Sequence, residues 1–258
     1  MFRVLAIGWR DFSAYVRSFS FYLLCAFFLG VSGYFFWSAL SYFSLLSFQV
    51  ATNPQASVES LNLTEGVLSP FLSNMSVLML LLVPILTMRS FSEEKKLGTL
   101  ELLFSYPISN VQIVAGKFLG LTAVLLVLTA PSIAYFFLAE VVGAHFETQT
   151  LLVGYGGFFL VSASFISLGM FVSSLTDHQA VSAGIGFVVL LFFWIVGWMA
   201  DWMSPAAGSV FQELSLTSHY FDLTRGIVDT MDLAFFVLFV VFFLFASLCS
   251  LEVRTWKR

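Results

Sequence analysis

Long apolar runs separated by short polar segments make up most of this chain. A helix needs about 20 apolar residues to cross the hydrocarbon core of a bilayer. Six runs come close to or exceed that length, at residues 19–43, 70–88, 111–139, 151–174, 180–200 and 233–251. The pattern therefore predicts six membrane-spanning helices in one transmembrane domain over residues 1–258.

Composition agrees with this pattern. Hydrophobic residues make up 59% of the chain and charged residues only 10%, whereas about a quarter of the residues in a soluble domain are charged. We therefore expect an all-α polytopic membrane protein. A soluble enzyme and a nucleic-acid-binding protein are both excluded by this composition.

The segment before the first run has a helical pattern of its own. Its apolar positions recur every three or four residues, which places them on one helical face, and they are Phe2, Leu5, Trp9, Phe12 and Val16. Three basic residues recur every seven positions beside that face: Arg3, Arg10 and Arg17. We expect an amphipathic helix over 2–17 that lies in the membrane interface, with Trp9, these arginines and Lys117 at the lipid surface. The alternative, an extension of the first span, would bury three arginines.

The basic residues also set the orientation, because Lys and Arg in short loops favour the cytoplasmic side. When the six spans are placed across the membrane in chain order, ten of the 11 Lys and Arg residues fall on the side of the two termini, and Arg225 is the exception. We therefore expect a multi-pass protein of the bacterial inner (cytoplasmic) membrane with both termini in the cytoplasm.

A charged segment, 89–107, lies between the second and third runs on that side. Ser90 followed by Glu93 fits a capping box, which predicts that a short helix begins there. We expect this helix to cover about 90–106, to be weakened at Gly98, and to end at Pro107. Ser109 with Gln112 offers a second capping box for the third span. The plain alternative is a solvated connection whose charges keep it out of lipid.

The sequence of this segment resembles the permease subunits of type-2 ABC exporters. The run PILTMRSFSEEKKLGTLELL at 84–103 carries the resemblance, followed by YPIS at 106–109 and IVAGKF at 113–118. SLTDHQAV at 174–181 and HYFDLTRGIVDTMD at 219–232 fit the same family. The chain is most similar to the GldF-like gliding-motility and NosY-like branch.

The resemblance implies that 90–106 is a coupling helix held in a cleft of a separate ATPase subunit. The residues it implies for this contact are Arg89, Ser90, Glu93, Glu94, Lys95, Lys96, Gly98, Thr99, Glu101, Pro107 and, from the second inner loop, Asp177. The expected partners are two ATPase copies that carry ATP and Mg, a second permease chain in a homodimer or heterodimer, and an auxiliary periplasmic or envelope protein. No G-x-x-x-x-G-K-[ST] phosphate loop occurs in the 258 residues, so we expect the chain to be no enzyme and to bind no cofactor itself.

The polar stretch before the last run is predicted to form an outer re-entrant segment at about 205–232 that seals the external mouth. Its candidate gate residues are His219, Tyr220, Asp222, Arg225, Gly226 and Asp229. We expect Arg225 to pair with Asp222 or Asp229. No ligand spacing supports a metal site here.

Three classes of function compete at this point. A secondary transporter or channel would place ionisable residues near the middle of the membrane, and an intramembrane enzyme would need a nucleophile or metal motif; the sequence has neither feature. An ATP-driven export permease is therefore favoured. A permease that transmits ATPase-driven motion to envelope partners, without a soluble cargo, stays open within that class, and the sequence does not identify a cargo.

Overall fold

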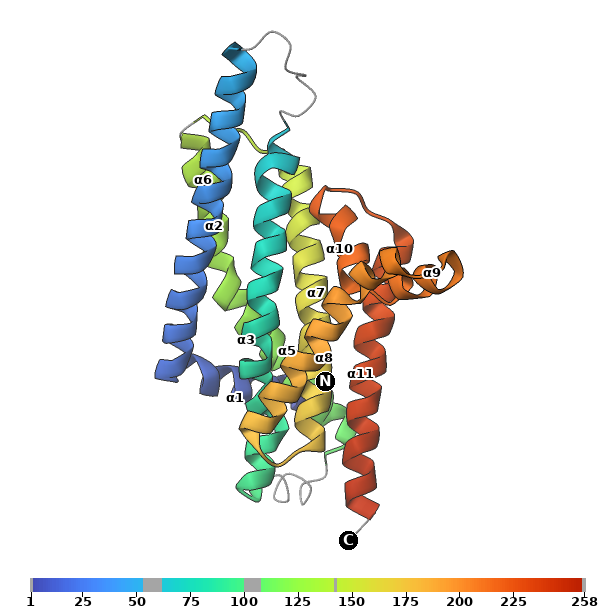
Figure 1. Ribbon diagram of the computed structural model, residues 1–258. Helices are drawn as coiled ribbons and strands as arrows, with labels where there is room; N and C mark the ends of the chain where they lie inside the picture. The colour runs from blue at the N-terminus through green and yellow to red at the C-terminus, as the bar shows by residue number, and fades with distance from the viewer. Residues whose placement is uncertain (1, 53–61, 100–107, 142, 257–258) are drawn as a thin grey trace.

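The computed structural model describes all residues except 1, 53–61, 100–107, 142 and 257–258, and every regular element in the described part is helical. Long helices lie side by side in a bundle, and α1 (Phe2–Val16) runs across one end of it (Figure 1). The C-terminal part of α11 (Thr230–Trp256) reaches the same end. We call this the terminal end and the opposite one the distal end.

The remaining elements follow in chain order. The first half contains α2 (Phe19–Thr52), a π-helical turn η2 (Thr64–Leu68), α3 (Ser69–Lys96), α5 (Asn110–Thr129), a 3-10 turn η3 (Ala130–Ile133) and α6 (Ala134–Val141). The second half contains α7 (Thr148–Leu175), α8 (Gln179–Ile195), a 3-10 helix η4 (Val196–Trp202), α9 (Pro205–Glu213) and α10 (Leu216–Thr224). The all-α prediction is confirmed.

Six of these helical stretches are long and apolar enough to cross a membrane. They are Phe19–Thr52, Thr64–Lys96, Asn110–Val141, Thr148–Leu175, Gln179–Ala200 and Thr230–Val253. Each of the six apolar runs of the sequence lies within one of them. The third stretch is interrupted at η3, where Pro131 removes a backbone donor and the helix tightens before it resumes as α6.

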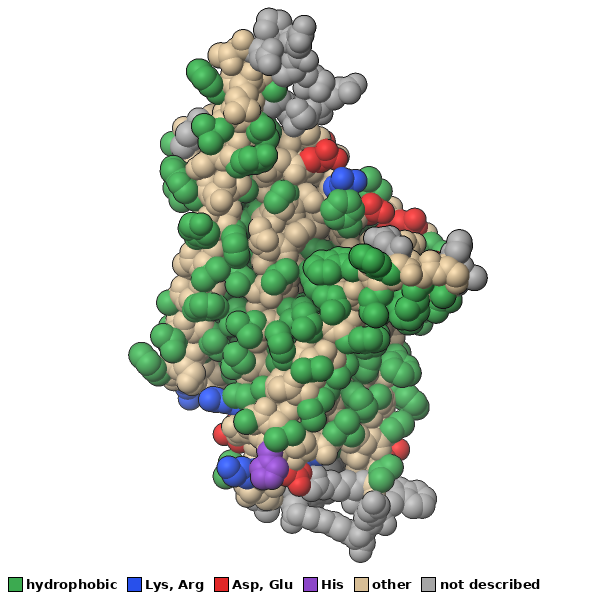
Figure 2. Space-filling view, in the orientation of Figure 1, with side chains coloured by type: hydrophobic (Ala, Val, Ile, Leu, Met, Phe, Trp, Pro, Cys, Tyr) green, Lys and Arg blue, Asp and Glu red, His purple; other side chains and the backbone are tan. Residues whose placement is uncertain are grey.

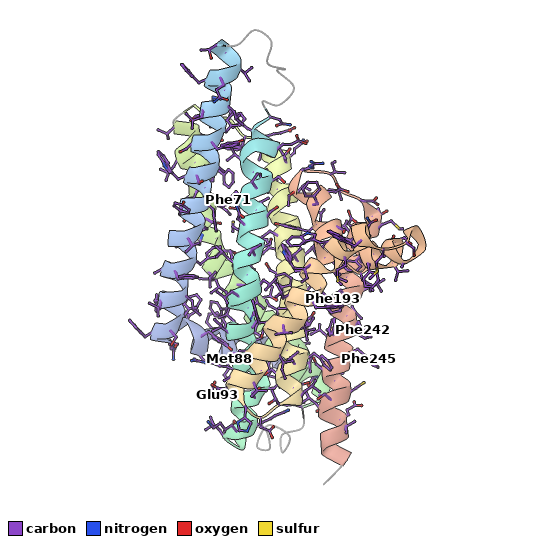
Figure 3. The ribbon with its side chains drawn as sticks, viewed as in Figure 1. Phe71, Met88, Glu93, Phe193, Phe242 and Phe245 are labelled. Atoms are coloured by element: carbon purple, nitrogen blue, oxygen red, sulfur yellow. The ribbon has the colours of Figure 1, made fainter. Side chains whose placement is uncertain are left out.

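The centre of the bundle is formed by α3 and α7. In the most apolar window of each, 61% and 72% of the residues are buried, against 17% for α2 and for α11. Phe71 of α3 packs edge-on against Phe36 of α2, with ring centroids 5.3 Å apart, and Figure 3 labels it near the distal end. On the other flank Phe193 of α8 packs against Phe239 of α11 at 5.3 Å. The peripheral helices therefore pack some of their aromatic side chains against neighbouring helices and expose others on the outer surface.

Hydrophobic and charged side chains are distributed over the outer surface as a lipid bilayer requires. In the face shown in Figure 2, hydrophobic side chains cover the middle of the molecule, and charged side chains gather toward its two ends. Two of the exposed apolar side chains are Phe242 and Phe245 of α11, both labelled in Figure 3. Because apolar surface of this extent is costly in water, the bundle is built to be solvated by lipid.

Glycines allow α1 to lie directly on α5 at the terminal end. A Cβ atom on Gly120 would stand 2.8 Å from the Gly8 carbonyl oxygen, and one on Gly8 would stand 2.9 Å from the Gly116 oxygen. Gly116 and Gly120 form a G-x-x-x-G pair, which lets two helical backbones approach closely. This crossing fixes α1 against the bundle and positions the site described next.

Candidate functional site

The terminal end of α3 differs from the sequence-based expectation. The prediction that a separate helix begins at Ser90 is wrong, because α3 continues without a break from Ser69 to Lys96. It stops where Gly98 adopts a left-handed φ of +69°, a conformation that glycine tolerates better than any other residue. Thr99 is again helical, while 100–107, with the predicted contact residues Glu101 and Pro107, lie outside the described residues.

The second predicted capping box is confirmed. The Gln112 backbone N–H donates to Ser109 Oγ at 3.3 Å, and the Ser109 N–H donates to Gln112 Oε1 at 3.4 Å. The reciprocal bonds satisfy two amides that a helix start leaves without intrahelical partners. They start α5 at Asn110, two turns before Lys117.

Four charged side chains join α1, α3 and α5 at this end. The Glu94 carboxylate oxygen Oε1 lies 2.8 Å from Lys117 Nζ and 2.9 Å from Arg10 Nη2. Asp11 contacts the same two cations, at 3.2 Å from Lys117 and 2.8 Å from Arg10. We call Arg10, Asp11, Glu94 and Lys117 the terminal ion-pair cluster. Its two anions and two cations balance.

The cluster revises two predicted roles. Lys117 was expected at the lipid surface, but its side chain is only 2% exposed and also lies over the Phe91 ring, 5.3 Å from the centroid. Gly116 and Gly120 bring α1 down over it, and Asp11 and Glu94 compensate its charge. Glu94 was expected to face the ATPase, but its side chain is turned inward and 19% exposed.

The other predicted interface residues lie on the surface of α1 or just after it. Trp9 is 69% exposed, and Arg3 and Arg17 are also exposed. These three side chains therefore have the exposure that a position at the membrane interface requires.

Tyr15, which was not among the predicted residues, attaches α1 to α3. Its hydroxyl donates to the Leu86 carbonyl oxygen of α3 at 2.7 Å. Burial raises the pKa of the Tyr15 phenol, and the Asp11 carboxylate raises it further, so the hydroxyl stays a neutral donor.

Serine side chains join the end of α3 to α7. Ser173 Oγ accepts from the backbone N–H groups of Phe91 and Ser92, each at 3.1 Å, and donates to the Met88 carbonyl oxygen at 3.2 Å. In return Ser92 Oγ donates to the Ser173 carbonyl oxygen at 3.1 Å. Because Ser92 and Ser173 are fully buried, this seam holds the two central helices in one register.

The second loop of the terminal end is attached to the same stretch. Lys95 Nζ donates to the Ser174 carbonyl oxygen and lies 3.9 Å from the Asp177 carboxylate. The Lys95 side chain is only 3% exposed, whereas that of Asp177 is 53% exposed. The structure thus brings the predicted contact residue Asp177 to the end of α3, although it follows α7 in the chain.

The exposed part of the predicted contact set is the tip beyond this anchored region. Lys96, Gly98 and Thr99 are exposed, and Leu97 is an apolar side chain with 67% exposure. Glu93 and Arg89 are half-buried and line a cavity of about 410 Å³ beside α1; Figure 3 labels Glu93 near the terminal end of α3. Ser90 is buried and lines the same cavity. The described part of the predicted set therefore divides into an anchored group, a group that lines this cavity, and an exposed tip.

The predicted gate residues lie at the distal side, on α10 and the segment that follows it. His219 Nδ1 lies 2.7 Å from Asp232 Oδ1, its Nε2 lies 3.1 Å from the Glu213 carbonyl oxygen, and its ring stacks on Phe235 at 4.1 Å. Asp229 Oδ1 accepts from the Met231 N–H at the start of α11. These contacts tie α10 to α11.

Arg225 does not pair as predicted. Its Nε lies 3.7 Å from Glu65 Oε1, and its guanidinium lies 4.2 Å from the Phe221 ring centroid, whereas the expected partners were Asp222 and Asp229. The pairing arises because α10 ends beside η2, and Gly226, with φ +83°, turns the chain away at that point. The partner belongs to a distant part of the sequence, which spacing along the segment cannot indicate.

Two buried contacts fix α10 to the distal end of α3. The Tyr220 hydroxyl donates to the Leu72 carbonyl oxygen at 3.1 Å, and the hydroxyls of Ser69 and Thr224 lie 2.7 Å apart. Among the residues that the structure describes, no three His, Cys, Asp or Glu side chains come close enough to hold a metal ion. The distal layer is thus held by hydrogen bonds and aromatic packing.

These features define a polytopic helical membrane subunit with an anchored, charged segment at one end and a helical layer at the other. A family model described as ABC-2 family transporter protein matches residues 5–234, and the chain belongs to that family. It is a transmembrane permease subunit, and permeases of this family work with ABC ATPase partners. A comparison with curated proteins finds no match.

Sequence reasoning missed several residues that organise the site. Asp11 was not among the residues predicted to matter, although it pairs with both Arg10 and Lys117. The G-x-x-x-G spacing of Gly116 and Gly120 was a readable signal for a close helix crossing. Ser173 had no such signal, because its role depends on which helix lies opposite.

Proposed function

We propose that this chain is the permease subunit of an ATP-driven exporter and that segment 89–107 docks into its ATPase partner on the cytoplasmic side, where both termini also lie. The observation that carries the proposal is the attachment of the last turns of α3 to three other helices. Glu94 binds groups of α1 and α5, and Ser92 and Lys95 bind α7 and its following loop. The exposed tip, Lys96 to Thr99, comes directly after these attached turns in the chain.

Such an arrangement suits the transmission of force. A partner that grips the tip at Lys96, Leu97 and Thr99 would move the end of α3, and the attached helices would have to move with it. Buried hydrogen bonds and ion pairs resist independent sliding because separation would leave polar groups unpaired. ATP binding and hydrolysis in two ATPase copies would thereby shift two permease halves between conformations.

Leu97 is the residue on which we expect docking to depend most. An apolar side chain with 67% exposure at a charged helix end fits a pocket of a protein partner, since buried apolar anchors supply much of the affinity of an interface. Lys96, the preceding residue, and Asp177, whose carboxylate lies 3.9 Å from Lys95 Nζ, carry opposite charges and would set its orientation. Glu94 is assigned to the internal cluster and not to direct contact with the partner.

The finer assignments rest on the sequence motifs and the family resemblance that they carry. We propose the GldF-like gliding-motility and NosY-like branch from the motifs at 84–118 and 174–181, and a second permease chain as homodimer or heterodimer partner. Transmission of motion to a periplasmic or envelope protein is the second candidate function, and the α9–α10 layer at the distal side is where such a partner would bind.

The test is copurification from the native membrane with a mild detergent, followed by mass spectrometry and an ATPase assay. We expect wild-type protein to retain a chain with a G-x-x-x-x-G-K-[ST] phosphate loop and Leu97→Asp to lose it while remaining folded. Leu152→Asp is the matched control, because Leu152 is 71% exposed near the distal end and lies outside the proposed contact. Equal retention by both variants would refute docking at the tip.

Cargo export and force transmission can then be separated with the same complex. Reconstitution of the permease and ATPase alone in vesicles should support ATPase activity in either case. If activity rises only when a copurified envelope protein is added, and no vesicle component changes leaflet or compartment, the force-transmitting function is favoured. A component that crosses the bilayer with ATP hydrolysis favours export.

A further inference from the structure

A polar cavity of about 410 Å³ lies between α1 and the terminal end of α3. Asp11 and Tyr15 line it from α1, and Arg89, Glu93 and Glu94 line it from α3. It adjoins the terminal ion-pair cluster on the side where the first span begins, and the cluster itself does not fill it. The proposed docking function leaves this cavity without a role.

Two buried polar atoms at the cavity have no partner. In the part of the chain that the structure describes, Glu94 Oε2 and Ser90 Oγ form no hydrogen bond, and Ser90 is only 5% exposed. A helical serine commonly donates to the carbonyl four residues earlier, but that carbonyl, Leu86, already accepts from the Tyr15 hydroxyl. Since buried polar groups in proteins are nearly always paired, this pair of oxygens calls for a donor from outside the chain.

The charges around the cavity specify what kind of donor fits. Within the described residues, the Glu93 carboxylate forms no ion pair, and the Glu94 oxygen Oε2 has no hydrogen-bond partner. Two acidic groups are therefore available to a ligand in the cavity. The Arg89 guanidinium likewise forms no ion pair within the described residues. Two carboxylates with a serine hydroxyl suit a primary ammonium, and a single guanidinium suits a phosphate. A zwitterion with both groups satisfies the whole set.

A second, apolar hollow continues from this cavity. Tyr15, Ser18 and Arg89 line both, and the second hollow, of about 30 Å³, is otherwise lined mainly by side chains of α2 and α3: Phe21, Leu24, Ile85 and Leu86. A hollow of this size accepts only the first methylenes of a chain, and the rest would then lie along the lipid-facing surface toward the middle of the bilayer. The order from polar cavity to guanidinium to apolar hollow is that of a phospholipid.

From these observations we propose that the cavity binds one phospholipid whose head group carries a primary ammonium, of the phosphatidylethanolamine class. The ammonium donates to Glu94 Oε2, Glu93 and Ser90 Oγ, the phosphate pairs with Arg89, and an acyl chain lies against Phe21 and Leu24. The lipid joins α1 to the end of α3 beside the ion-pair cluster. This assignment does not depend on docking at the tip.

The test is native mass spectrometry of the full chain, delipidated in detergent and incubated with phospholipids of identical acyl chains. We expect wild type to retain one phosphatidylethanolamine about tenfold better than phosphatidylcholine, whose methylated ammonium cannot donate, a factor that corresponds to one charge-assisted hydrogen bond. Glu93→Gln should lower this ratio, because it replaces a charged acceptor by a neutral one while Glu94 Oε2 and Ser90 Oγ remain as acceptors. Arg89→Gln should lower retention of both lipids.

Arg17→Gln is the matched control, because Arg17 is an exposed cation just after α1 and lies outside the cavity lining. It should keep the wild-type preference, which separates the site from general attraction of lipid to basic residues. Equal retention of the two lipids by wild type, or an Arg89→Gln variant that behaves as Arg17→Gln does, overturns the proposal. So does displacement by soluble glycerophosphoethanolamine at concentrations equal to the lipid, because an acyl chain would then contribute nothing.

Discussion

Replacement of Lys117 by methionine tests how strongly the terminal ion-pair cluster holds α1, α3 and α5 together. Methionine keeps most of the volume of the side chain but removes the ammonium that lies 2.8 Å from Glu94 and 3.2 Å from Asp11. The two carboxylates are then left with Arg10 as the remaining cation of the cluster. The side chain that is removed is 2% exposed, so water does not replace it easily.

The expected cost follows from burial. Removal of one partner from a buried ion pair costs about 3–5 kcal/mol, because the remaining charge is left uncompensated. The carboxylates of Asp11 and Glu94 retain 15% and 19% exposure, which lowers the penalty toward about 3 kcal/mol of unfolding free energy. Glu94→Gln alone should cost less, about 1–2 kcal/mol, because Lys117 keeps Asp11 as a partner.

The double variant makes the test specific. When Lys117→Met and Glu94→Gln are combined, the surplus negative charge disappears, and the loss should be smaller than the sum of the single losses by about 2 kcal/mol. The assay is reversible unfolding in mixed detergent micelles, followed by helix content, for the wild type and the three variants. A coupling below about 0.5 kcal/mol, the usual scatter for independent sites, would refute an energetic link between α3 and α5 through this pair.

Three further predictions concern contacts elsewhere in the bundle. Gly120→Val should press a branched side chain onto the Gly8 backbone, where even a Cβ would approach to 2.8 Å, and lower the unfolding free energy by about 1–3 kcal/mol. Protease cleavage within α1 should increase, and unchanged protection would contradict the crossing. Ser173→Ala should lower the unfolding free energy in detergent by about 1–3 kcal/mol, because it removes the hydroxyl that bonds three backbone groups of α3. A smaller change would show that the seam is not a main contact between α3 and α7. Arg225→Glu should destabilise the distal layer by less than about 1 kcal/mol, since the pair of Arg225 with Glu65 is partly exposed. The double variant that also carries Glu65→Arg should recover the wild-type melting temperature, and absence of recovery would exclude the pair.

Periodicity and composition predicted the spans well because lipid imposes a strong and local condition on each one. About 20 apolar residues are needed wherever a helix crosses, and each of the six candidate spans contains one of the predicted runs. The capping box at Ser109 was readable for the same reason, since its two bonds join residues three positions apart. Local rules of this kind need no knowledge of the neighbouring helices.

The errors concern places where a distant contact overrides a local pattern. Ser90 and Glu93 have the spacing of a capping box, but contacts of the surrounding residues with α7 keep α3 helical through that point. Lys117 looks like an interfacial lysine until α1 is placed over it by Gly116 and Gly120. Arg225 has two acidic neighbours in sequence and pairs with Glu65, which lies before α3.

The geometry of α3 connects the two ends of the molecule. This helix contains 28 residues, which gives it a length of about 42 Å at a rise of 1.5 Å per residue. At its distal end Tyr220 and Thr224 of α10 bind it through buried hydrogen bonds, and at its terminal end the ion-pair cluster and the Ser173 seam hold it. A sideways shift of the terminal end therefore has to appear as a tilt of the distal layer, unless α3 bends at its internal Pro84. Buried ion pairs add little stability compared with apolar packing, so we expect their value at this position to be the fixed register that they give α1, α3 and α5.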